Sequence, residues 1–236
     1  MSFDLKLHAY RLLMDEPFFA ALSRRVEKRE DRSIPTAGVR VNPDTAQFEM
    51  YYNPDFLAGL PEEHVRGVLK HEFYHLIFEH VTSRKPEGVN HKVWNICADL
   101  AINSHLQGEL PEMACMPGVG PFEDLPLHKS AEWYLANFPE RDENEEGESG
   151  SGEGGEGEGE GEPGSFDDHS GWDDNADSPQ QQEANQMAKE RLKNAMKEAA
   201  KEASQSAKGR GSMSGEVKES ILTRLERKVD WLKVGR

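Results

Sequence analysis

The sequence has few cysteines, no long apolar run and no basic face. Its two cysteines, Cys97 and Cys115, form neither a Cys-x-x-Cys site nor a disulfide framework. Free thiols suit a reducing compartment, so we expect a cytoplasmic location. No apolar stretch reaches the roughly 18 residues that a membrane helix needs, and residues 1–15 lack the basic segment and apolar run of a signal peptide. Neither membrane insertion nor secretion is expected.

The charge of the chain is unevenly distributed. The formal net charge is -16, and twelve acidic residues lie between Asp142 and Asp168, where there is no Lys or Arg. This segment is dominated by Glu, Gly and Ser, which cannot bury enough apolar surface to offset the entropy lost on ordering. We predict a disordered acidic linker over residues 141–165. Because no basic surface is evident elsewhere, nucleic-acid binding is not expected.

The most informative stretch is His71-Glu72-Phe73-Tyr74-His75, which matches the pattern H-E-x-x-H. Two imidazoles four residues apart share one face of a helix and can bind the same metal ion. Glu72 lies between them and can take a proton from a water activated by the metal. The alternative is a structural helix with two buried histidines, each of which would then need a hydrogen-bond partner of its own.

The surroundings of this motif predict a central, largely buried helix. Pro61 and the two acidic residues after it resemble a helix first turn. Apolar residues then recur at helical spacing on more than one face: Val65, Val68, Leu69, Phe73, Leu76 and Ile77.

His80 is the next histidine after the motif. On a continuing helix it would lie about 180° from His71, so we interpret it as a C-terminal helix residue beside the negative end of the dipole. No glycine follows His75 to turn the chain back. A third metal ligand must therefore come from another element.

A second predicted helix, from about His91 to Leu106, offers that ligand. It is largely apolar, but Asn95, Asp99 and Asn103 are spaced four residues apart and share one face. A buried carboxylate without a partner is costly, and a metal ion would compensate it. A structural carboxylate bonded to backbone amides is the alternative.

We therefore predict a Zn²⁺ site formed by His71, His75 and Asp99, with the fourth position open as in catalytic zinc sites. Asn95 and Asn103 would orient these ligands through hydrogen bonds. Two other histidines could compete as the third ligand, but neither shares the helix face of Asp99: His91 and His105.

The remaining pattern predicts an α+β fold that is mostly helical. Residues 3–29 have a helical apolar pattern that Pro17 can interrupt, and residues 36–52 alternate on both sides of a turn, which predicts a small β-hairpin. The hairpin either pairs with an extended peptide or only covers the helix. A short helix is expected from about Ser130. Two C-terminal helices are expected at 178–208 and 217–234.

Three of these stretches together resemble a known family. Residues 69–75, 94–103 and 130–134 are similar to the putative metallopeptidase domain of bacterial and phage proteins, and the resemblance continues at 167–172 and 228–231. It implies a zincin-like fold and a metal-dependent peptidase activity. In that family the domain is usually fused to a von Willebrand factor A-like domain and often accompanies MoxR-type ATPases. The resemblance therefore implies an ATPase or A-like partner. No A-like part is expected in this sequence, which is then either a short version of the family or a truncated one.

We predict three parts: a zincin-like metallopeptidase domain at 1–140, the linker at 141–165, and a docking motif with two helices at 166–236. The first part would hydrolyse a peptide or protein substrate, with Glu72 as the general base. The alternative is a metal-stabilised adaptor module without turnover, since the same ligands serve both.

The docking motif adds candidates for the site. Asp168 and His169 can supply a ligand, an oxyanion donor or an inhibitory plug, or can lie at the surface without a role. Tyr74 is the other candidate oxyanion donor.

Overall fold

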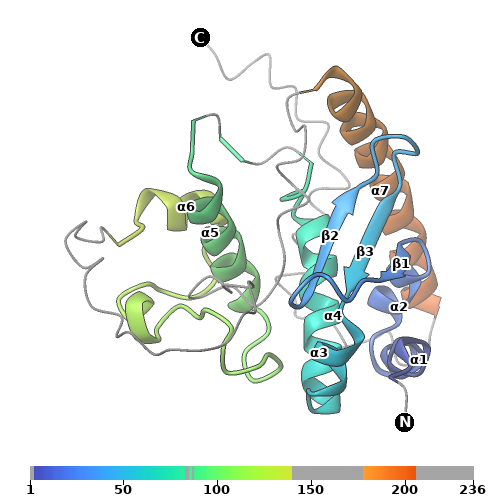
Figure 1. The fold of residues 1–236 in the computed structure, drawn as a ribbon, viewed down its shortest axis with the longest axis horizontal. Helices are drawn as coiled ribbons and strands as arrows, with labels where there is room; N and C mark the ends of the chain where they lie inside the picture. Colours follow the sequence, from blue (N-terminus) through green and yellow to red (C-terminus); the bar gives the residue numbers. More distant parts are fainter. Residues whose placement is uncertain (1–2, 83–84, 87, 140–177, 206–236) are drawn as a thin grey trace.

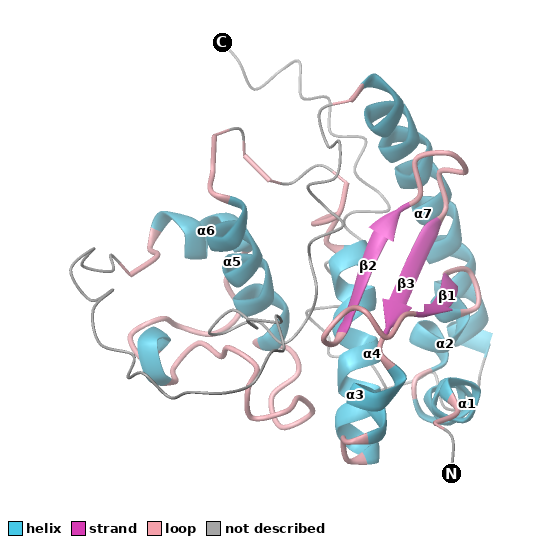
Figure 2. Cartoon of the chain, viewed as in Figure 1, coloured by secondary structure: helices cyan, strands magenta, loops and turns pink. Residues whose placement is uncertain are grey.

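The computed structural model describes residues 3–82, 85–86, 88–139 and 178–205. It has an α+β architecture in which helices surround one small sheet (Figures 1 and 2). The predicted linker, the docking motif and the last predicted helix lie outside the described residues. Within the described ranges, no helix combines the length and the apolar character that crossing a membrane requires.

The first two helices are separated at Pro17, as expected. α1 (Leu5–Asp15) is capped by Asp4, and α2 (Pro17–Ser23) begins with the proline itself. The prediction that helix continues to Arg29 is wrong, because Glu27–Glu30 form strand β1. These four residues carry no apolar side chain to extend a helical stripe, so pairing with the sheet decides their conformation.

The predicted hairpin is confirmed. β2 (Ala37–Val41) runs antiparallel to β3 (Phe48–Tyr52), and β1 pairs with the other side of β3 in parallel, so the strand order is β1-β3-β2. α3 (Pro54–Ala58) follows the sheet. β2 is an edge strand that contacts α4 (Glu62–Ile77), the helix that follows α3. This position is compatible with both interpretations of the hairpin, a strand that pairs with a peptide and a strand that covers the helix.

The buried apolar side chains form two clusters. The first lies between the sheet, α1, α2, α4 (Glu62–Ile77) and α7 (Pro179–Gln205). The second lies between α5 (His91–Asn103), α6 (Ala131–Ala136) and the loop that contains the 3-10 helix η1 (Gly120–Phe122). α4 and α5 contact each other where the two clusters meet (Figure 1). The H-E-x-x-H helix therefore lies at the boundary between the two cores.

α7 packs on the first cluster through its apolar stripe. The buried residues of the stripe are Ala184, Ala188, Leu192, Met196 and Ala199. Met187, on the same helix, is 46% exposed. Arg191 ties the helix to the hairpin turn by donating to the carbonyl oxygens of Thr45 (2.6 Å) and Ala46 (3.0 Å). Residues after the linker thus share a core with residues before it, while the boundary at 140 stays a prediction.

α4 is held in place by contacts made midway along its length. Lys70 is only 6% exposed, and its ammonium group pairs with the carboxylates of Glu16 (3.2 Å) and Glu109. Burial raises the pKa of Glu16, and the charge of Lys70 opposes that rise. One turn earlier, Gly67 lets the backbone of Glu109 approach α4 closely. These contacts set the position of the helix that carries the histidines.

We expect Gly67→Ala to destabilise the protein. A Cβ at this position would lie 1.9 Å from the carbonyl oxygen of Glu109, so the backbone has to shift. Overpacking of this kind costs about 1–3 kcal/mol. Urea denaturation measures the change. Gly59→Ala is the matched control, because a Cβ there meets no atom closer than 3.4 Å. Equal stability of the two variants would contradict the close approach.

Candidate metal centre

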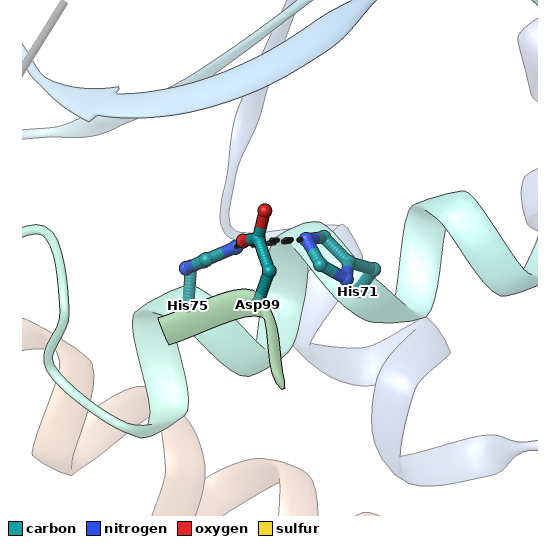
Figure 3. A group of neighbouring side chains, drawn as sticks. All are labelled: His71, His75 and Asp99. Carbon is teal, nitrogen blue, oxygen red and sulfur yellow. Dashed lines mark hydrogen bonds and ion pairs between the residues drawn. The ribbon is translucent and has the colours of Figure 1, made fainter. Parts of the chain in front are cut away.

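Three polar side chains from two helices converge at the contact between α4 and α5 (Figure 3). His71 Nε2 lies 2.8 Å from His75 Nε2, and Asp99 Oδ1 lies 3.6 Å and 3.3 Å from these two nitrogens. All three side chains are completely buried. Three potential metal ligands thus lie within 4.8 Å of one another.

The local sequence explains why they meet. His71 and His75 are one helical turn apart on α4, so their rings project from the same face. Asp99 lies in the middle of α5, whose other buried residues are mostly apolar, and α5 is capped by Asn90, which accepts from the N–H of Lys92 at 2.9 Å. The crossing of the two helices then brings the carboxylate to the two imidazoles.

A chain of hydrogen bonds determines which nitrogen of His71 carries the proton. The side-chain amide of Asn103 donates to the carbonyl oxygen of Cys115 at 2.7 Å. Its own oxygen therefore faces His71 Nδ1, 2.8 Å away, and accepts from it. The proton of neutral His71 is then on Nδ1, and Nε2 presents its lone pair to His75 and Asp99. A lone pair and a carboxylate that face each other in a buried site favour a cation between them.

One histidine near this group was misinterpreted from the sequence. His80 is not part of α4, which ends at Ile77. The chain turns back after Phe78, and His80 Nδ1 lies 3.3 Å from His75 Nδ1, on the side of the ring away from Asp99. The expectation that His80 lies opposite the site is wrong, because that expectation required a continuing helix. Instead of a continuing helix the chain forms a turn, in which Glu79 has a positive φ of 61°. A glycine at this position would have indicated the turn in the sequence.

Other predicted residues lie elsewhere. Tyr74 packs against Phe19, with ring centroids 5.2 Å apart, in the first core, so it is not an oxyanion donor at this site. His105 stacks on Tyr74. Among the described residues, the metal-ligand group contains neither His91 nor His105.

Two sets of candidates stay predictions. Asn95 is buried on the Asp99 face, and its side-chain oxygen has no hydrogen-bond partner among the described residues, so its expected orienting role stays a prediction. Asp168 and His169 lie outside the described residues. Glu72 is completely buried on α4 between the two histidines.

Neither nearby thiol belongs to the metal-ligand group found among the described residues. Cys97 lies two residues before Asp99 on α5, and burial raises its pKa to about 12. Cys115 contributes its backbone carbonyl to the Asn103 hydrogen bond. The side chains of the candidate metal-ligand group among the described residues therefore offer nitrogen and oxygen atoms.

Comparisons with known proteins agree with this chemistry. The sequence model of a family described as "putative metallopeptidase domain" matches residues 2–236. A protein of Thermotoga maritima, itself named only as uncharacterized, is 29% identical over 70 residues. That match covers 30% of this chain and 17% of the length of the relative. No solved structure matches the chain.

We expect divalent metal to stabilise the protein through these three side chains. A ligand that binds only the folded state adds about 2.7 kcal/mol to the free energy of unfolding at a concentration of 100 Kd. Thermal denaturation with and without added zinc or cobalt measures this effect. Asp99→Asn should abolish it, while Asp124→Asn, which changes an exposed carboxylate, should retain it. Equal stabilisation of both variants would exclude Asp99 from the site.

Proposed function

This chain belongs to the family of putative metallopeptidase domains, and from that premise we propose that it is a zinc-dependent peptidase. His71, His75 and Asp99 would hold the ion, and Glu72 would be the general base. The substrate would be a peptide or a protein. A partner of the MoxR-type ATPase or A-like class stays a prediction.

The observation that carries this proposal is the contact of His71 Nδ1 with the side-chain oxygen of Asn103, 2.8 Å away. Because Asn103 accepts the Nδ1 proton, a lone pair of His71 points at His75 Nε2, 2.8 Å away, and towards Asp99 Oδ1, 3.6 Å away. This arrangement supports a bound cation.

The donor set and its spacing favour zinc. Two imidazole nitrogens and one carboxylate oxygen match the ligand types of catalytic zinc sites, in which three protein ligands leave a fourth position open. Ligands about 2.0 Å from a tetrahedral ion are about 3.3 Å from one another. The three observed separations, 2.8, 3.3 and 3.6 Å, lie around that value.

The protein side chains would divide the chemistry between them. When bound, the ion would supply Lewis acidity towards a peptide carbonyl and an attacking water. Glu72 would take the proton of that water and deliver it to the leaving amine. Asn103 would keep the His71 ring in its ligating orientation by accepting the Nδ1 proton. The position of Glu72 on α4, completely buried and between the two histidines in the sequence, supports this role.

The decisive variant is Glu72→Gln. It keeps the shape of the side chain but removes the base, so we expect stoichiometric zinc to remain while cleavage of a peptide library falls by about 10²–10⁴-fold. Zinc content and cleavage rate are measured on the same preparations. Glu63→Gln is the matched control, because Glu63 is an exposed residue in the first turn of the same helix.

Two outcomes would count against the peptidase. If the wild-type protein holds zinc and cleaves nothing in a broad library, the non-catalytic adaptor becomes the better interpretation. If Glu72→Gln cleaves as fast as the wild-type protein, another residue is the base.

A further inference from the structure

The end of α4 folds back on itself in a specific way. The backbone N–H of His80 donates to the carbonyl oxygen of His75 at 3.0 Å, and that of Glu79 donates to Leu76 at 2.9 Å. This pair of bonds defines a Schellman motif, in which the residue after the cap adopts a left-handed conformation. Glu79 occupies that position with a φ of 61°. The motif places His80 directly over His75.

The side chains of the same two residues also meet. His80 Nδ1 lies 3.3 Å from His75 Nδ1, and the ring centroids are 5.3 Å apart. His80 is 3% exposed and packs edge-to-face on the ring of Trp94, which is completely buried on α5. A ring enclosed by both α4 and α5 has little freedom to turn away. The contact with His75 is therefore part of the core and not a surface encounter.

His71 and His75 are held in the same way, because the Nδ1 atom of each faces a polar group of another residue. His71 Nδ1 faces the amide oxygen of Asn103 on α5, and His75 Nδ1 faces Nδ1 of His80. Both Nε2 atoms face Asp99. A histidine that binds a metal through one ring nitrogen carries its proton on the other, and an acceptor for that proton orients the ring.

We propose that His80 is the positioning residue for His75: its Nδ1 accepts the Nδ1 proton of His75 and thereby keeps His75 Nε2 free to bind the metal. His80 is then the Nε2-protonated tautomer. It is not itself a ligand, since it contacts His75 on the side remote from Asp99. The inference rests on the proposed metal site, and it adds to that site a hydrogen bond between His75 and His80. The turn after α4 then orients the ring of His75, as Asn103 orients the ring of His71.

Substitution of His80 separates this role from simple space filling. His80→Leu fills similar space but offers no acceptor, so we expect the dissociation constant for zinc or cobalt to rise about 10–100-fold. His80→Asn puts an amide oxygen at the position of Nδ1, the same acceptor that serves His71, and should restore affinity close to the wild-type value. His8→Leu is the control, because His8 lies on α1 and outside the metal-ligand group.

A spectroscopic signature tests the proton directly. In zinc-loaded protein with isotopically labelled histidine, His75 should show a protonated, slowly exchanging Nδ1 in the wild type and in His80→Asn. The slow exchange should be lost in His80→Leu. A space-filling role for His80 would leave this signal unchanged.

Substitution of Glu79 tests the turn itself and leaves the imidazole of His80 unchanged. Glu79→Gly suits the left-handed conformation and should keep both the melting temperature and the metal affinity. Glu79→Val disfavours that conformation, so it should lower the melting temperature by several degrees and weaken metal binding.

The outcomes distinguish the two proposals. If the wild-type protein binds no metal, the proposed function fails. If the wild-type protein binds zinc and His80→Leu, although folded, binds it with the same affinity, only the role of His80 is overturned. Weakened binding in His80→Leu without recovery in His80→Asn would also overturn it, because the loss would then reflect packing and not the hydrogen bond.

Discussion

Burial of two imidazoles and one carboxylate at a single helix crossing is the constraint on which the rest of this structure depends. Each of His71, His75 and Asp99 is completely removed from water, and groups of this kind are costly to bury unless they are paired. Their mutual distances allow one cation to compensate all three. The two cores on either side of the crossing must therefore meet in one relative position, or the polar groups lose their partners.

The structure secures that position from both sides. On the first side, the ion pairs of the buried Lys70 and the close approach at Gly67 hold α4 against α2 and the Glu109 loop. On the second side, Asn103 joins α5 to the Cys115 loop while it accepts from His71. The orientation of the candidate metal ligands and the packing of the core therefore depend on the same hydrogen bonds. Substitutions in either core are expected to reach the site through the orientation of its ligands.

Much of the fold was predictable where a periodic pattern was long. The helices that became α4, α5 and α7 follow from apolar spacing, and the hairpin follows from alternation around a turn. Strand β1 did not follow, because Glu27–Glu30 is short, polar and paired with β3, a neighbour distant in sequence. The turn after α4 did not follow either, since Glu79 takes a conformation that usually marks glycine.

The sequence by itself determined that two histidines share one helix face and that Asp99 shares another with Asn95 and Asn103, because helical spacing is a local property. It could not show that Asn103 faces His71 or that His80 returns to His75. Those relations depend on how α4 crosses α5 and on a left-handed turn that tertiary packing imposes. The tertiary structure alone decided which polar side chains near the H-E-x-x-H helix touch its histidines, because those contacts join residues from different elements.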